Sequence, residues 1–141
     1  MPKGPDPRKE ARPLADVPEM LSEGAREFAA RRFWHAHEAW EGAWHALRAA
    51  GDADAAAYLK GMILVAAALE NATRGKEEGF KRQMAEGLYA LRTHPEGAAR
   101  LGLDDPGSWL DALALLYVDA CRRRDWSWWN ASGWQAPPVP L

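Results

Sequence analysis

The sequence predicts an all-α fold, an antiparallel bundle of about five helices with a Trp-rich extended C-terminal tail. Among the 141 residues there are 28 Ala and 15 Leu, against one Ile, four Val and two Thr. Ala and Leu lose little freedom in a helix and β-branched residues favour strands, so this composition excludes a β-rich fold. Apolar residues also recur at steps of three and four between Gly and Pro. A chain of this length forms one core, so we expect one bundle domain over residues 17–125.

The first two helices are expected between a proline-rich start and a glycine. Residues 1–16 hold four prolines and alternating charges, which predicts a flexible arm. Apolar residues recur at helical spacing after Pro18, so a first helix should run to about residue 31. A second helix, from about residue 33 to 50, should end at Gly51, because glycine readily adopts the left-handed conformation that follows a helix.

The third predicted helix is the centre of the bundle. It should begin at a cap formed by Asp52 or Asp54, run to about Arg74 and end at Gly75. Its middle, GMILVAAAL, is apolar on every side. Such a helix is normally covered by others on most of its surface.

Two further helices are expected to cover this centre. A fourth, over about residues 76–93, carries a narrow apolar stripe with charged residues opposite. After a connection over residues 95–105, Asp105-Pro106 supplies a cap and a first helical residue for the fifth helix. Cys121, in the apolar part of that helix, is expected to be buried.

The tail, residues 126–141, lacks a helical period and ends in prolines. A buried Trp removes roughly 150–250 Å² from water, and several loose Trp side chains would promote aggregation. We therefore expect the tail to fold back over the bundle as an extended strap, or to pack in a dimer interface. The residues concerned are Trp126, Trp128, Trp129 and Trp134.

Charge and cysteine content narrow the classes of partner and compartment. The net charge of −2 and the pI near 6.1 give no attraction for nucleic acid or for anionic membranes, so neither is an expected partner. A single cysteine precludes an intrachain disulfide and fits a reducing compartment. The charged, proline-rich start lacks the apolar run of a signal peptide. These features predict a cytoplasmic location.

Residues 33–45, FWHAHEAWEGAWH, are the segment that could carry chemistry. On a helix, His37, Glu41 and His45 form a ladder in which each side chain reaches the next. We expect His37 to be substantially buried, because it lies between apolar residues on one stripe. These are Phe33, Trp40 and Trp44, which we also take as the expected lining of a pocket.

Two interpretations of His37 follow. In one, Glu41 or a group on the third helix accepts the imidazole N–H, and the pair is a satisfied core contact. In the other, His37 and Glu41 are two ligands of a divalent metal ion, or a base and its orienting group. That polar cluster would draw further groups from Glu38, Glu70 or Asn71. The segment is not a zincin helix, since Glu41 stands where HExxH requires histidine.

The same residues resemble a known family, the small helical domain-of-unknown-function family numbered 309. The similar elements are His37-Glu38-x-x-Glu41-x-x-Trp44, then Lys60-Gly61-Met62-Ile63 leading into three alanines, within about residues 20–92. The resemblance implies an antiparallel helical bundle of prokaryotic origin with no established activity. Two residues depart from the family pattern, Leu64 where members often have Gln and Asn71 where many have His.

Three functions are compatible with these features. The favoured one is a non-catalytic module that binds a protein partner or itself through the Trp-rich tail. The second is a metal-dependent or acid–base, hydrolase-like enzyme centred on the HExxE helix, although a divalent metal is not the favoured cofactor and the cofactor is unknown. The third is a small-molecule site lined by aromatic rings and carboxylates.

Overall fold

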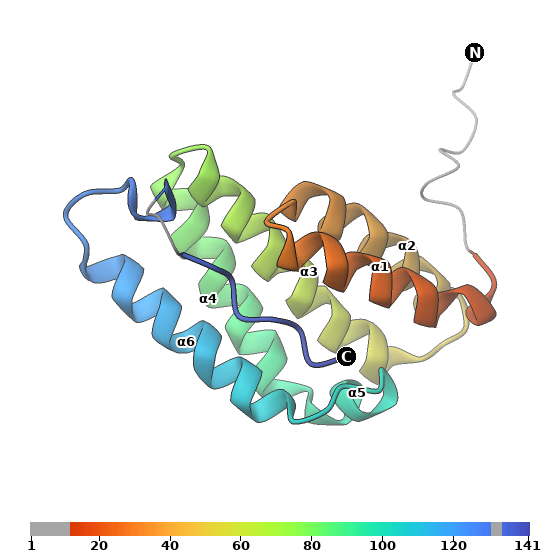
Figure 1. The fold of residues 1–141 in the computed structure, drawn as a ribbon. Helices are drawn as coiled ribbons and strands as arrows, with labels where there is room; N and C mark the ends of the chain where they lie inside the picture. The colour runs from red at the N-terminus through yellow and green to blue at the C-terminus, as the bar shows by residue number, and fades with distance from the viewer. Residues whose placement is uncertain (1–11, 131–133) are drawn as a thin grey trace, which may run out of the picture.

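The computed structural model describes residues 12–130 and 134–141, and every regular element within those ranges is helical (Figure 1). The fold is therefore all-α, as the composition predicts. None of the helices in the described ranges combines the length and the apolar character needed to cross a bilayer. The elements are η1 (Leu14–Asp16), α1 (Val17–Ala29), α2 (Phe33–Ala49), α3 (Ala53–Thr73), α4 (Glu77–Thr93), α5 (Pro95–Arg100), α6 (Pro106–Arg122) and η2 (Trp128–Asn130).

Local signals set the helix boundaries. Gly51 and Gly75 end α2 and α3 with φ angles of 78° and 73°, a region that costs glycine little. Asp52, rather than Asp54, caps α3 by accepting a hydrogen bond from the Ala55 amide at 3.3 Å. Asp105 caps α6 in the same way, and its carboxylate also accepts the Ser108 hydroxyl at 2.6 Å.

Helix α3 is the centre of the bundle, as its apolar surface predicts. It packs against α2 and α4, and α5 covers its N-terminal part. The approach of α3 to α4 depends on glycine: a Cβ at Gly61 would lie 3.0 Å from Ala90 Cβ, and one at Gly87 would lie 3.0 Å from the Gly61 carbonyl oxygen. Small residues at this crossing let the two backbones pack closely.

The Trp-rich tail packs against the bundle of its own chain. Trp128 is buried and its ring contacts that of Phe80 at 5.7 Å between centroids. Farther on, Pro137 accepts a hydrogen bond from the Trp109 indole at 3.0 Å, and Pro140 accepts one from the Asp104 amide at 2.8 Å. Figure 1 shows these last residues running back across the helices to end near α5. In the described residues the tail thus lies on the bundle of its own chain.

The first part of the tail also contacts the α1–α2 junction. Arg31, which has a φ of 62°, places its guanidinium 4.3 Å from the centroid of the Trp134 ring and donates to the Trp129 carbonyl. Trp134 in turn meets the ring of Phe33 at 6.2 Å. Residues far apart in the sequence are thereby joined, since Arg31 and Trp129 are separated by 98 positions.

Three segments differ from expectation. The expected connection over residues 95–105 contains a short helix, α5, so the bundle has six α-helices in the described residues instead of about five. The predicted arm over residues 1–16 lies mostly outside the described residues, but its last part, Leu14–Asp16, forms a 3-10 turn that leads directly into α1. Cys121 is exposed rather than buried, because the buried stripe of α6 consists of Trp109, Leu113 and Ala120.

Candidate functional site

The buried stripe of α2 is centred away from His37. Phe33 and Trp40 have no exposed surface and belong to the core, and neither lines the pocket described below. Ala36 and Ala43 are equally buried and complete the stripe. Because each residue turns a helix by about 100°, this stripe leaves position 37 at its edge. The expected place of His37 in the middle of the stripe is therefore corrected.

His37 nevertheless keeps most of its surface away from solvent. Its side chain is 17% exposed, and its Nδ1 atom is excluded from solvent and makes no hydrogen bond within the described residues. That atom lies 3.6 Å from Glu38 Oε1 and 3.6 Å from Glu41 Oε2. The indole of Trp34, itself half exposed, stacks on the imidazole at 5.0 Å with an interplanar angle of 7°. The ring is thus held between an indole and two carboxylates.

Glu41 lies between two imidazoles. Its Oε2 approaches His37, and its Oε1 is 3.7 Å from His45 Nε2. The ladder of His37, Glu41 and His45 predicted from the spacing is therefore present, while His35 is exposed. One ligand atom from each of His37, Glu38 and Glu41 lies within 4.8 Å of the others. All three come from one helix, so no tertiary rearrangement is needed to gather them.

Glu70 and Asn71 do not join this group. Glu70 forms an ion pair with Arg74, 3.0 Å from its Nε atom. Asn71 donates a hydrogen bond to the Gln83 side chain on α4. Both residues are on the third helix as expected. Glu70 pairs with the residue one turn further along the chain, and Asn71 faces α4.

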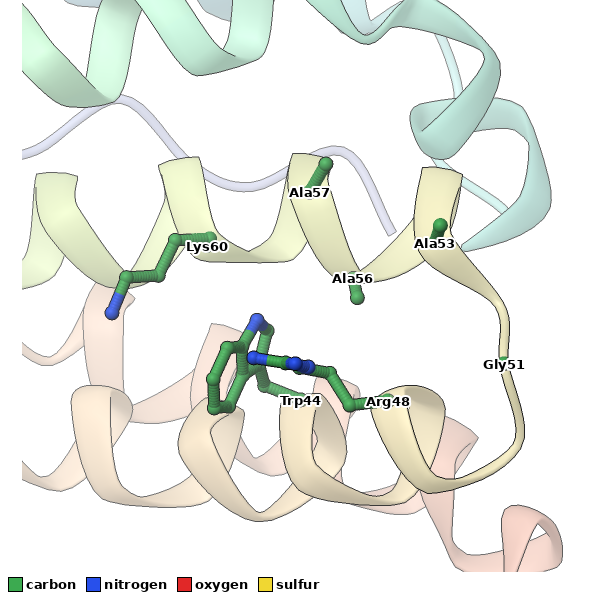
Figure 2. A pocket seen from close by; sticks show the side chains of 7 residues that line it. All are labelled: Trp44, Arg48, Gly51, Ala53, Ala56, Ala57 and Lys60. Atoms are coloured by element: carbon green, nitrogen blue, oxygen red, sulfur yellow. The ribbon is translucent and has the colours of Figure 1, made fainter.

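A pocket lies beside this cluster, between α2 and α3 (Figure 2). Its volume is about 490 Å³, and Trp44 and Arg48 from α2 face Lys60 from α3 across it. Both cations lie near the Trp44 ring: the Arg48 Cζ is 5.0 Å and the Lys60 Nζ 5.2 Å from its centroid. The remaining wall is small and apolar, formed by Ala53, Ala56 and Ala57 beside Gly51.

This pocket differs from the one expected from the sequence. Of the predicted lining only Trp44 is present, and the charged groups are cations rather than carboxylates. The spacing of Trp44 and Arg48, one helical turn apart, was a usable signal. Lys60 could be placed only by knowing which face of α3 meets α2.

The carboxylate nearest in sequence to the pocket is engaged elsewhere. Asp52 accepts two hydrogen bonds from Arg100, each at 2.8 Å. That hydrogen bonding, with help from the Ala55 amide, holds the pKa of Asp52 below its ordinary value despite some desolvation. Asp52 is therefore charged and paired with Arg100, not with Arg48.

The part of the chain that contains the His37 cluster and the pocket is similar to a known protein family. Residues 21–83 match the family model described as domain of unknown function, DUF309. We call residues 21–83 the DUF309 segment, because they are similar to this family model; they make up less than half of the chain. No curated protein and no solved structure matches the chain.

The DUF309 segment begins inside α1 and ends inside α4. It contains the His37 cluster, the pocket and all of α2 and α3. Helices α5 and α6 and the tail lie outside it.

Proposed function

We propose that this protein is a metal-binding module in which His37, Glu38 and Glu41 of the DUF309 segment hold a divalent transition-metal ion. The observation that carries the proposal is the Nδ1 atom of His37. It is excluded from solvent, lacks a hydrogen bond within the described residues, and is directed at two carboxylates. A buried nitrogen of this kind ordinarily has a partner, and a metal ion would supply one.

The distances suit such an ion. Two ligands about 2.1 Å from a tetrahedral metal centre are about 3.4 Å apart. His37 Nδ1 is 3.6 Å from the nearest oxygen of each glutamate. Small rotations of the side chains would therefore complete the coordination, and the position of Trp34 on the imidazole restricts the ring to one orientation.

The ligand types indicate the class of metal. One imidazole and two carboxylates suit Zn²⁺ or Mn²⁺, whereas an all-oxygen site would suit Ca²⁺. Two carboxylates also neutralise a divalent charge. Three protein ligands leave coordination positions for water or for another molecule. Catalytic zinc sites have such open positions, whereas structural zinc sites have four protein ligands.

Calorimetric titration of chelator-treated protein with ZnCl₂, MnCl₂ and CaCl₂ tests the proposal. We expect one equivalent of Zn²⁺ or Mn²⁺ to bind, and His37→Gln and Glu41→Gln to abolish that binding without a change in the helical circular dichroism. His35→Gln is the matched control, since that histidine is on the same helix but outside the cluster. Absence of binding to the wild-type protein, or equal loss in the control, would show that the cluster is a structural contact.

A second function, self-association, is favoured by the outer face of α6. Four exposed residues follow one another at steps of four, three and four: Asp111, Leu115, Val118 and Arg122. Leu115 is 72% and Val118 43% exposed. If a second copy packs antiparallel on this face, Leu115 meets Val118 of the partner copy, and Asp111 meets Arg122. The stripe is thus complementary to itself in both polarity and charge.

Such an interface would be small, so we propose a weak dimer. Sedimentation equilibrium over a range of concentrations measures it. Asp111→Arg should weaken association by placing like charges opposite each other, and adding Arg122→Asp should restore it. Tyr89→Arg, at an exposed apolar residue on α4, is the control. A wild-type protein that stays monomeric at every concentration, or a double variant that stays weakened, would refute the pairing.

A further inference from the structure

The pocket between α2 and α3 gathers positive charge on one aromatic ring. The guanidinium of Arg48 and the ammonium of Lys60 lie 5.0 and 5.2 Å from the centroid of the Trp44 ring. Figure 2 shows the two side chains approaching the indole from different helices. The attraction of each cation for the ring is modest at an exposed site, and the two cations repel each other.

Neither cation has a carboxylate to balance it. Within residues 12–130 and 134–141, Arg48 and Lys60 form no ion pair, whereas Arg74, Lys81 and Arg123 each pair with an acid one helical turn away. Asp52, the acid beside the pocket, is paired with Arg100. The Trp44 indole N–H also makes no hydrogen bond within the same residues. The pocket therefore offers three unused donor groups.

We propose that this pocket binds a small organic anion that carries a planar apolar body. The anionic group would lie between Arg48 and Lys60, where a guanidinium can donate two parallel hydrogen bonds to two oxygens. The apolar body would rest against the Trp44 ring and the methyl groups of Ala53 and Ala56. The pocket volume of about 490 Å³ is of the size that holds small ligands.

Carboxylates and phosphate monoesters share this chemistry, since both present charged oxygens on an organic body. The site uses neither His37 nor its neighbouring glutamates, so it is independent of the proposed metal. A site lined by carboxylates, as expected from the sequence, would favour a cationic ligand. The charged groups that line this pocket are cations, so it favours an anion.

Four probes separate the contributions: 2-naphthoate, 2-naphthyl phosphate, the cationic 2-naphthylmethylamine, and inorganic phosphate. Binding is followed in ¹⁵N-labelled full-length protein by the indole N–H signal of Trp44, assigned from its loss in Trp44→Phe. We expect one or both naphthyl anions to shift that signal saturably, and the amine and inorganic phosphate to leave it unchanged. Whichever naphthyl anion binds more tightly identifies a carboxylate or a phosphate ester as the ligand.

The variants Arg48→Gln and Lys60→Gln should each weaken binding of the anion by about fivefold or more. Arg82→Gln, at an exposed arginine of α4, should bind as the wild type does. Because all three replaced side chains are exposed, unchanged melting temperatures are expected and confirm that the fold is intact. The proposal is overturned if the amine binds as well as the anions, if the Gln variants bind normally, or if no probe shifts the Trp44 signal.

Discussion

Gly24 of α1 lies directly against the indole of Trp40 on α2. A Cβ at position 24 would be only 2.1 Å from Trp40 Nε1, and the same nitrogen donates a hydrogen bond to the Leu21 carbonyl at 3.2 Å. Trp40 has no exposed surface. The candidate site is on α2, and the close packing of α1 on α2 therefore requires glycine at position 24.

Gly24→Ala should therefore destabilise the fold, although alanine is the better helix former. Overpacking a core of this kind costs about 1–3 kcal/mol, which exceeds or equals the gain in helix propensity of about 1 kcal/mol. Gly107→Ala, in the first turn of α6 where nothing lies within 4 Å, should be neutral or slightly stabilising. Urea denaturation of the two variants measures the difference, and similar midpoints would contradict the crossing described.

Replacing Tyr58 with phenylalanine is not expected to destabilise the fold. Its side chain is buried, its hydroxyl makes no hydrogen bond within the described residues, and burial raises its pKa to about 12. Removing an unsatisfied buried hydroxyl relieves a desolvation cost of about 1–3 kcal/mol. Tyr58→Phe should therefore leave the free energy of unfolding unchanged or raise it. A loss of more than about 1 kcal/mol would mean that the hydroxyl has a hydrogen-bond partner.

The Asp52–Arg100 pair predicts a specific dependence of stability on pH. Because the pKa of Asp52 is lowered in the folded state from 3.8, its contribution is fully present above that value. It is lost as the pH falls through the lower, folded-state pKa. Asp52→Asn should cost about 0.2–1 kcal/mol at pH 7, since Arg100 is more than half exposed and Asp52 is partly exposed, and the cost should shrink below pH 4.

Thermal unfolding at several pH values checks this expectation. Arg100→Gln should give a similar loss at pH 7, and the double variant should lose little more than either single variant, because both changes remove the same contact. Additive losses would indicate that Asp52 acts through the α3 cap alone.

Trp134 is expected to contribute to stability from outside the helices. Its ring contacts those of Trp128 at 5.2 Å and Phe33 at 6.2 Å, beneath the guanidinium of Arg31. Trp134→Ala should lower the free energy of unfolding by about 2 kcal/mol, less than for a fully buried Trp because part of the ring is exposed. Leu141→Ala, at an exposed side chain, should change it little. Fluorescence-detected urea denaturation distinguishes the two.

Helix ends and the fate of the tail could be predicted because both depend on local or compositional physics. Gly51, Gly75, Asp52 and Asp105 act within one turn of their own position. Tryptophan side chains need burial whatever the topology, so the composition predicted that the tail packs on the bundle or in a dimer interface, without deciding between the two.

The candidate site was less accessible to sequence reasoning. The i, i+4 ladder of His37 and Glu41 followed from spacing alone, but the depth of His37 did not. Ala36 and Ala43 complete the buried stripe, and alanine is too common in this chain to mark a core position. The pairing of Lys60 with Trp44 depends on the rotation of α3 about its axis, which no local pattern encodes.

The glycine-mediated crossing of α3 and α4 affects the stability expected of residues 21–83 as an isolated fragment. The sequence likeness stops at residue 83, halfway along α4, whereas the partners of Gly61, namely Gly87, Ala90 and Leu91, come after it. A recombinant fragment with those limits would expose to water the part of α3 that packs against the end of α4. Phe33 would also lose its ring contact with Trp134. We therefore expect a fragment of residues 21–83 to be less stable than the whole chain.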